Sequence, residues 1–202
     1  MTAAPVESAR DRRKLRARRD LALAAVTLFD QQGFAATTVE EIAAAADYSA
    51  STFFRMFTRK EDAVFFDMPD RLENLRITLA PGSRWADLRA ALLEHAHTWE
   101  ADDPAFAAAR VRLLHREPSL TSRYLEYCLE YEVWLTELIS GSRNADSRTD
   151  IAAQVAAACI VGALRSAFQV QAERPPRKAA SVVDYLQDAF DVLESGPLRV
   201  IA

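Results

Sequence analysis

Apolar residues recur at helical spacing along most of this 202-residue chain, and no other feature limits the fold as strongly. Leu21, Ala25, Leu28 and Phe29 show the i, i+4, i+7, i+8 spacing that lines one face of a helix. Glycine (5) and proline (8) are scarce, and alanine, leucine, arginine and glutamate, which favour helices, dominate. Alternating strand patterns are nearly absent. The sequence therefore predicts an all-α protein of about nine helices.

Turn and capping signals set the bounds of the predicted helices. Thr38 and Glu41 form a capping box, Ser49 suits the N-cap of the next helix, and Gly33 suits the end of the first. Pro69 should kink or break the helix that starts at Lys60 or Glu61. The predicted helices are 11–32, two short ones opened by Thr38 and Ser49, the one from 60 or 61 through 68, and then 85–100, 104–117, 120–139, 151–172 and 181–194.

Composition and cysteine usage exclude several classes of protein. Hydrophobic residues make up 50% of the chain and charged residues 27%, the balance of a soluble globular protein. No uninterrupted apolar run approaches the roughly 20 residues of a membrane span, and the N-terminus lacks the apolar region of a secretory signal. Cys128 and Cys159 lie too far apart in sequence for a CxxC pair. We expect a cytoplasmic protein with no membrane partner, metal or cofactor.

Positive charge is concentrated near the N-terminus. Through Lys60 the chain has 10 Lys and Arg against 7 Asp and Glu, and the remainder has 15 against 22. Seven of these cations fall within residues 10–19. A basic N-terminal segment followed by an acidic remainder predicts that the N-terminal part of the chain binds a polyanion. Taken alone, the charge fits a solvated helix end or a disordered tail equally well.

The stretch DYSASTFFRMFTRK, residues 47–60, follows a short helix and a tight turn, which is the outline of a helix-turn-helix. At 100° per residue, Phe53, Met56 and Phe57 share one helical face, which predicts packing on partner helices. Ala50, Ser51, Phe54 and Arg55 share the opposite face. These residues would present methyl, hydroxyl, ring and guanidinium groups to the major groove of DNA.

A family resemblance extends over residues 14–70. The segment GFAATTVEEIA, the recognition-helix pattern SASTFFRMF and the opening KEDAV agree in order, spacing and residue type with the N-terminal domain of the TetR family of bacterial regulators. The segment STFFRMFTRKEDAVFFDMPDRLENLR resembles the branch that includes the mycofactocin regulator. The resemblance implies a three-helix DNA-binding domain followed by a helical ligand-binding and dimerisation domain.

The predicted domains are a basic arm at 1–13, a helix-turn-helix domain at 14–60 with its motif at about 37–56, and a ligand-binding and dimerisation domain at 61–202. The resemblance implies phosphate contacts from Thr38 and Lys60. Asp47 replaces the usual turn glycine, and Phe54 replaces a tyrosine. Beside a helix-turn-helix, the basic arm is expected to touch phosphates or the minor groove. The predicted DNA contacts are Arg12, Arg13, Arg16, Arg19, Thr38, Ser49, Ala50, Ser51, Thr52, Phe54, Arg55 and Lys60.

Two other classes of function fit the sequence less well than a DNA-binding regulator does. A di-iron enzyme in a helical bundle needs two Glu-x-x-His pairs, and only Glu94 and His97 form one. A helical interaction module without DNA binding would leave the pattern from Thr38 to Lys60 unexplained. Cys128 and Cys159 could sense oxidants, although inert core thiols are commoner in apolar helices. We therefore predict a DNA-binding regulator, a ligand-released homodimeric repressor that is not an enzyme, acting on a near-palindromic operator.

The last two helices are predicted to form the homodimer interface. The penultimate helix is apolar on so much of its circumference that both sides should be buried. The last helix keeps a single apolar stripe. The predicted interface residues are Ala156, Ile160, Ala163, Ala167, Leu186, Phe190 and Leu193.

An aromatic stripe on the longest C-terminal helix offers a candidate effector site. Such a stripe is more often core than pocket, but buried tyrosine hydroxyls need polar partners. A largely apolar cavity with a few hydroxyls would suit a small amphipathic or apolar effector, and the resemblance implies acyl-coenzyme A thioesters or similar molecules. The predicted lining is Phe65, Met68, His95, Trp99, Phe106, Tyr127, Tyr131 and Trp134.

Overall fold

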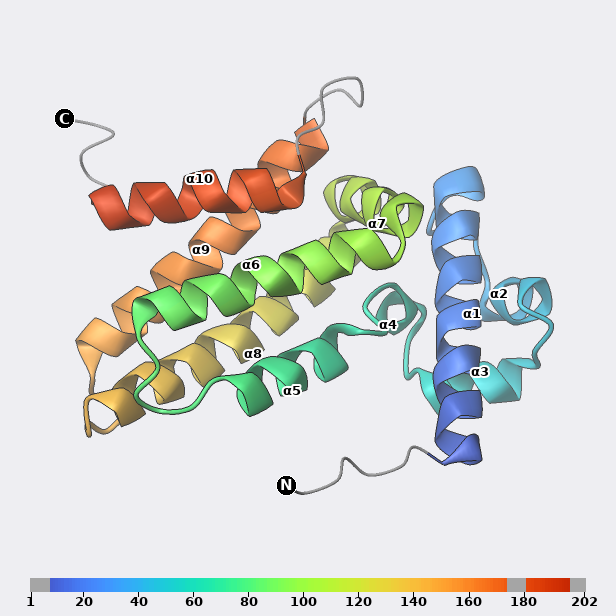
Figure 1. Cartoon of the computed structure of the whole chain (residues 1–202). Helices are drawn as coiled ribbons and strands as arrows, with labels where there is room; N and C mark the ends of the chain where they lie inside the picture. Colours follow the sequence, from blue (N-terminus) through green and yellow to red (C-terminus); the bar gives the residue numbers. More distant parts are fainter. Residues whose placement is uncertain (1–7, 174–180, 197–202) are drawn as a thin grey trace. The chain divides into compact units, whose positions relative to one another are not determined.

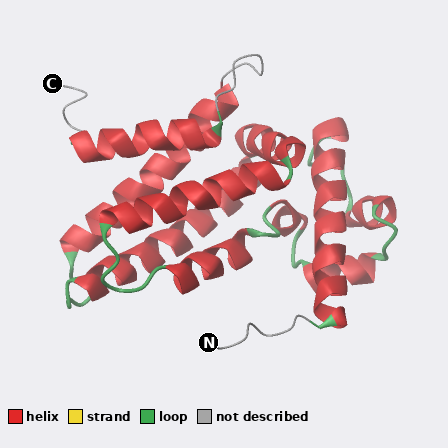
Figure 2. Ribbon diagram, viewed as in Figure 1, coloured by secondary structure: helices red, strands yellow, loops and turns green. Residues whose placement is uncertain are grey.

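The computed structural model describes residues 8–173 and 181–196. Within these ranges it contains ten α-helices and no strand (Figure 2). The chain divides into two compact units, Met1–Phe66 and Asp67–Ala202, and each is considered by itself. The all-α prediction is confirmed. Part of the predicted arm lies outside the described residues.

The first unit contains α1 (Ala9–Gln32), α2 (Val39–Ala45), α3 (Ala50–Met56) and α4 (Lys60–Val64) (Figure 1). Its core is built from fully buried side chains that the helical stripes supply, chiefly Leu21, Phe29, Ile42 and Phe53. The predicted capping box at Thr38 and the predicted cap at Ser49 are both present. Asp47 takes the left-handed conformation, with φ of 59°, at the turn between α2 and α3.

The basic N-terminal residues are helical from Ala9 onward. Ser8 is the N-cap of α1 and accepts a hydrogen bond from the backbone N–H of Asp11 at 3.2 Å. Arg12 and Arg13 therefore belong to a regular helix, which begins two residues before the predicted start at residue 11. A helix holds their side chains in a fixed angular order.

The second unit contains α5 (Met68–Thr78), α6 (Trp85–Asp102), α7 (Pro104–Arg116), α8 (Pro118–Ser142), α9 (Ile151–Glu173) and α10 (Val182–Ser195). In this unit α9 packs against α7, α8 and α10, and α10 also packs on α6 (Figure 1). Its core includes Leu92, Leu135, Leu186 and Phe190. One helix more than predicted is present because the predicted helix at 60–68 ends at Val64, and Pro69 lies in the first turn of a new helix.

Helix α9 is the one described helix that is long and apolar enough to cross a membrane by length and composition. A core helix of a soluble protein passes the same test. In this structure Ala153, Ala157, Ile160 and Ala167 are buried within the unit. The opposite side carries Ile151, Val155 and Val170, which are 70%, 54% and 39% exposed.

The packing of α9 and α10 corrects the predicted dimer contacts. Ile160, Ala163, Ala167, Leu186 and Phe190 belong to the core of their own chain. Phe190 is 0% exposed and its ring meets that of Trp85 edge-on at 5.3 Å. Of the seven predicted residues, only Ala156 and Leu193 are partly exposed. Helical periodicity shows that α9 has two apolar sides, but it does not show which one the chain itself covers.

Candidate nucleic-acid interface and ligand cavity

One face of the recognition helix α3 is buried within the first unit, and the opposite face is exposed. Phe53 is 0% exposed and Phe57 5%, with their ring centroids 5.3 Å apart. Phe54, one residue along, is 57% exposed, and Ser51 and Arg55 are also exposed. The predicted division of this helix into a packing face and an outward face is thus present. Met56 is an exception to this division, because its side chain is only partly buried and lines a groove.

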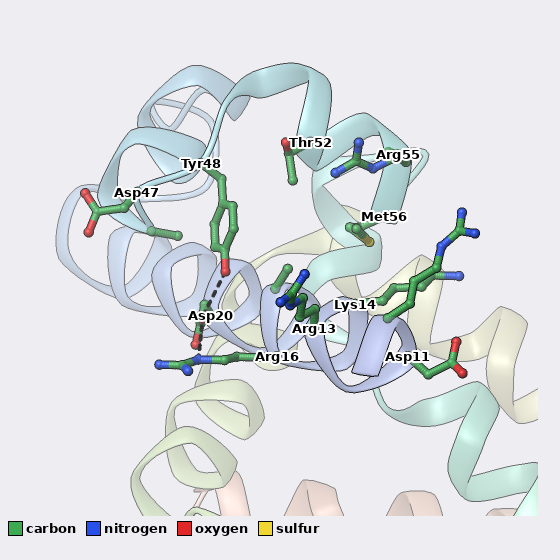
Figure 3. A pocket seen from close by; sticks show the side chains of 13 residues that line it. Asp11, Arg13, Lys14, Arg16, Asp20, Asp47, Tyr48, Thr52, Arg55 and Met56 are labelled. Atoms are coloured by element: carbon green, nitrogen blue, oxygen red, sulfur yellow. Dashed lines mark hydrogen bonds and ion pairs between the residues drawn. The ribbon is translucent and has the colours of Figure 1, made fainter. Parts of the chain in front are cut away.

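The groove lies between the N-terminal half of α1 and the α2–α3 segment (Figure 3). Its cationic side chains are Arg10, Arg13, Lys14, Arg16 and Arg55, and its acidic ones are Asp11, Asp20 and Asp47. Cations therefore outnumber carboxylates by five to three. Such a groove can hold an anionic polymer backbone, because each neutralised phosphate releases bound counterions.

The α2–α3 turn is held to α1 by a hydrogen bond across the groove floor. Tyr48 donates its hydroxyl hydrogen to Asp20 Oδ2 at 3.2 Å, and Arg16 Nε lies 3.9 Å from the same oxygen (Figure 3). Burial, together with Asp20, raises the pKa of the Tyr48 phenol. The phenol therefore remains a donor at neutral pH. Its hydrogen bond to Asp20 fixes the residue just before α3 against α1.

Eight of the predicted DNA contacts fall into three groups. Arg13, Arg16, Thr52 and Arg55 line the groove, whereas Arg12 and Arg19 are exposed on α1 outside it. Thr38 and Ser49 are exposed and occupied in capping. Sequence reasoning left out Arg10 and Lys14, although both belong to the cation run at residues 10–19.

Lys60 is engaged within the first unit. Its Nζ donates hydrogen bonds to the backbone oxygens of Phe34 at 2.7 Å and Thr37 at 2.9 Å, and it lies 4.1 Å from the Phe34 ring centroid. These contacts fasten the α1–α2 connection to the start of α4. The predicted phosphate contact of Lys60 stays a prediction, and it would have to coexist with this internal role.

The second unit encloses a cavity of about 70 Å³. Its wall comes from five helices, α5 to α9. The predicted residues Met68, His95, Trp99 and Tyr131 line it, and so do several that were not predicted: Arg71, Leu92, Ala96, Arg110, Val111, Leu114, Tyr124, Cys128, Val161, Leu164 and Phe168. Ligand pockets usually measure about 300–1,000 Å³, so this cavity is too small to hold a drug-sized ligand as it stands.

Four predicted lining residues lie elsewhere, which corrects their assignment. Phe65 is 1% exposed and belongs to the first unit. Tyr127 packs against Arg123, whose guanidinium carbon lies 4.5 Å from the Tyr127 ring centroid. Trp134 is in the core, and Phe106 lies beside Arg110 but outside the cavity wall. A helix stripe wraps around its axis, so only part of it can face one cavity.

A buried polar cluster forms one part of the cavity wall. Arg110 Nη1 donates to Asp67 Oδ1 at 2.7 Å, and Arg71 Nε donates to Asp67 Oδ2 at 2.6 Å. Burial acts to raise the pKa of Asp67, but Arg110 and Arg71 outweigh it and hold that pKa below its ordinary value of 3.8. Asp67 is therefore a carboxylate at neutral pH.

His95 and Tyr131 complete the polar part of the wall. The Tyr131 hydroxyl lies 3.3 Å from His95 Nε2. Burial, reinforced by Arg71, lowers the pKa of His95 to about 4, and burial raises the pKa of Tyr131. Both rings are therefore neutral at pH 7, and Nε2 can accept the hydroxyl hydrogen. Among the described residues, no group of three His, Cys, Asp or Glu side chains could hold a metal ion.

A capped recognition helix beside a cationic groove defines a helix-turn-helix DNA-binding protein. Residues 22–64 match the family described as bacterial regulatory proteins, tetR family, and residues 83–197 match the MftR C-terminal domain. The chain belongs to the TetR family of transcriptional regulators, with a C-terminal unit of the MftR type. The resemblance found in the sequence is thereby confirmed.

Two curated relatives are similar over long stretches. The chain is 32% identical over 148 residues to the HTH-type transcriptional regulator TcmR of Streptomyces glaucescens, a match that covers 68% of this chain and 66% of TcmR. It is 25% identical over 201 residues to the putative mycofactocin biosynthesis transcriptional regulator MftR of Mycobacterium tuberculosis (strain ATCC 25618 / H37Rv), covering 95% of this chain and 96% of MftR. Both relatives are regulators.

Solved structures share the fold. SmeT, the repressor of the Stenotrophomonas maltophilia multidrug efflux pump SmeDEF, superposes with a TM-score of 0.60 at 16% identity, covering 88% of each chain. Thermus thermophilus FadR, a repressor solved in complex with lauroyl-CoA, gives 0.53 at 20% identity, covering 88% of this chain and 93% of FadR. At these identities the likeness concerns architecture alone.

Proposed function

We propose that this regulator is a homodimeric repressor that binds a near-palindromic double-stranded operator and is released by a small amphipathic or apolar effector. The observation that carries the proposal is the outward face of α3, which presents Ser51, Phe54 and Arg55 beside a cationic groove. Its place of action would be the cytoplasm, and the proposal assigns no reaction and no cofactor to the chain.

In the proposed complex, α3 reads the major groove and α1 holds the phosphate backbone. Arg55 can pair with a guanine edge, and Ser51 can bond to several bases. Arg10, Arg13, Lys14 and Arg16 sit on a rigid helix, so their contacts fix register and orientation and carry no sequence information directly. Arg12 and Arg19 are proposed to add weaker, salt-screened attraction from outside the groove.

Dimerisation is proposed to use the exposed side of α9. Ile151, Val155 and Val170 would leave apolar area in water in a lone chain, and Ala152, Ala158 and Cys159 on the same exposed side are small enough for close approach. Val192 of α10 is 40% exposed and would extend the surface. A twofold axis through this surface would repeat the recognition helices in the manner of a palindromic operator.

The effector is proposed to enter the cavity of the second unit. FadR, solved with lauroyl-CoA, shares this fold, and the cavity wall here is mostly apolar with a few polar groups. At about 70 Å³ the cavity must enlarge before it holds such a molecule. The conformation that binds effector would therefore differ from the one described, and an effector could shift the population between the two.

The test is a fluorescence-anisotropy titration of the protein with the DNA upstream of its own gene and with random duplex at matched salt. We expect preferential binding to the former and two chains per operator in sedimentation. Arg55→Ala should relax base preference at one position per half-site, at a cost of about 1–3 kcal/mol. Equal affinity for both duplexes, or a monomer in the complex, would contradict the proposal.

A further inference from the structure

The cavity of the second unit has an apolar part and a cationic part. Leu92, Leu114, Val161 and Leu164 contribute hydrocarbon, whereas Arg71 and Arg110 bring guanidinium groups to the same wall. The side chain of Arg110 is 4% exposed and that of Arg71 14% exposed. Two arginines at such depth are unusual, because each buried ion loses several kcal/mol of hydration unless it is paired.

The two arginines share a buried partner. Both donate to the carboxylate of Asp67, which is not among the residues that line the cavity. Arg71 also donates to Asp102 at 3.1 Å, but the Asp102 side chain is 66% exposed and largely screened by water. His95, the other basic group in the wall, is neutral at pH 7. Both guanidinium groups thus lie at the cavity wall while they bind Asp67.

We propose that Arg71 and Arg110 form the subsite for the carboxylate of an otherwise apolar effector, which binds by taking the place of Asp67 in its ion pairs. This rests on the proposed effector role of the cavity and names the chemical class of its ligand. A carboxylate fits because it reproduces the shape and charge of the group that it replaces, and guanidinium binds both in the same fork geometry. The hydrocarbon part would occupy the apolar wall.

The exchange at Asp67 would also affect the backbone, because Asp67 is the first residue of the second unit. Asp67 directly follows Phe66, the last residue of the first unit, and precedes α5. Within the first unit, Arg18 of α1 donates a hydrogen bond to the backbone oxygen of Phe66. Two neighbouring residues are therefore anchored by separate arginine contacts. An effector carboxylate would free Asp67 and leave the link between the units with one anchor fewer.

The test uses a charge series of equal chain length: decanoate, decanol and decylammonium. Binding to the full-length protein without DNA is followed by isothermal titration calorimetry and by tryptophan fluorescence, since Trp99 lines the cavity. We expect decanoate to bind at least tenfold more tightly than either of the other probes. Octanoate should bind more weakly than decanoate by roughly fourfold per methylene removed, because the chain is buried in hydrocarbon.

The decisive variant is Asp67→Asn, which removes the competing charge and keeps the side-chain shape. It should raise the affinity for decanoate at least fivefold and leave that for decanol within twofold. Arg110→Met should abolish the preference for decanoate over decanol. Since that variant leaves Asp67 with fewer partners, the double variant Arg110→Met/Asp67→Asn repeats the test without the unpaired charge. Arg76→Met, a partly exposed arginine of α5, is the matched control and should change nothing.

Several results would overturn the subsite. These are equal affinity for decanoate and decanol, no binding of decanoate at millimolar concentration, or an Asp67→Asn variant whose decanoate affinity does not rise. Because all of these measurements omit DNA, they are independent of operator release. A decanoate complex that still binds the operator fully would instead refute the proposed release, with the subsite intact.

Discussion

The two sites of this protein differ in how much of them exists before a partner arrives. The groove of the first unit is open, and most of its charged side chains stand in water. The cavity of the second unit measures only about 70 Å³, and its arginines are already bound to Asp67. The groove can accept an anionic backbone as it stands, whereas the cavity must exchange contacts and enlarge. Under the proposed function, DNA recognition would thus be preformed, whereas effector binding would require a rearrangement.

The sites also differ in their origin along the chain. The groove residues come from two short segments, 10–20 and 46–56, whereas the cavity residues are spread from Met68 to Phe168. Local capping and one tyrosine hydrogen bond contribute to the groove, together with the packing of α1 against α2 and α3. The cavity depends on the joint packing of five helices. Three experiments test this difference between the two units.

The largest expected effect concerns the rear face of α3. Phe53→Ala should cost roughly 3–5 kcal/mol of unfolding free energy, because it leaves a cavity where a fully buried ring stood. Phe54→Ala, the adjacent exposed position, is the control and should stay within about 0.5 kcal/mol of the wild type. Urea unfolding followed by circular dichroism measures both. Similar losses in the two variants would show that the recognition helix is not packed as described.

The second effect is a loss of stability at acid pH, which should arise in the second unit, where His95 lies. The folded-state pKa of His95 is about 4, against 6.5 for an ordinary histidine, because of burial and Arg71. Below pH 6.5 the unfolded chain takes up the proton more readily, so stability should fall as pH drops from about 6.5 to 4, by up to about 3 kcal/mol. The pKa of Asp67 is held below its ordinary value by Arg110 and Arg71, so as the pH falls its carboxylate protonates later than an ordinary aspartate.

The measurement compares unfolding free energies of the wild type and His95→Gln at pH 7 and pH 4.5. The wild type should lose more stability on acidification than the variant, and the difference should appear in the second unit. If both proteins lose the same amount, His95 is not held neutral by the fold.

The smallest effect tests the internal role of Lys60. Lys60→Met removes two hydrogen bonds to the carbonyls of Phe34 and Thr37 and should cost about 1–3 kcal/mol of stability. Arg59→Met, the adjacent exposed cation, serves as the control. If Lys60 also holds a phosphate, the slope of operator affinity against salt should fall by about one in the Lys60 variant. An unchanged stability would refute the internal role.

Features that depend on neighbours a few residues apart could be predicted from the sequence. Helical periodicity defined the all-α class, and the side chains of Thr38 and Ser49 reach backbone N–H groups three residues on, so both caps were predictable. The outward face of α3 follows from the 100° step of the helix. Asp47 adopts the left-handed turn because its short side chain tolerates positive φ.

Which apolar surfaces meet and which partners the long side chains reach could be seen only in the folded protein. It placed one side of α9 in the core and left Val155 outside, a choice that depends on the positions of α8 and α10. It directed Lys60 to carbonyls 23 and 26 residues away. It also brought Arg110 to Asp67 across 43 residues. Such pairs have no signature in local spacing, because burial, which sets their energy, is a property of the assembled fold.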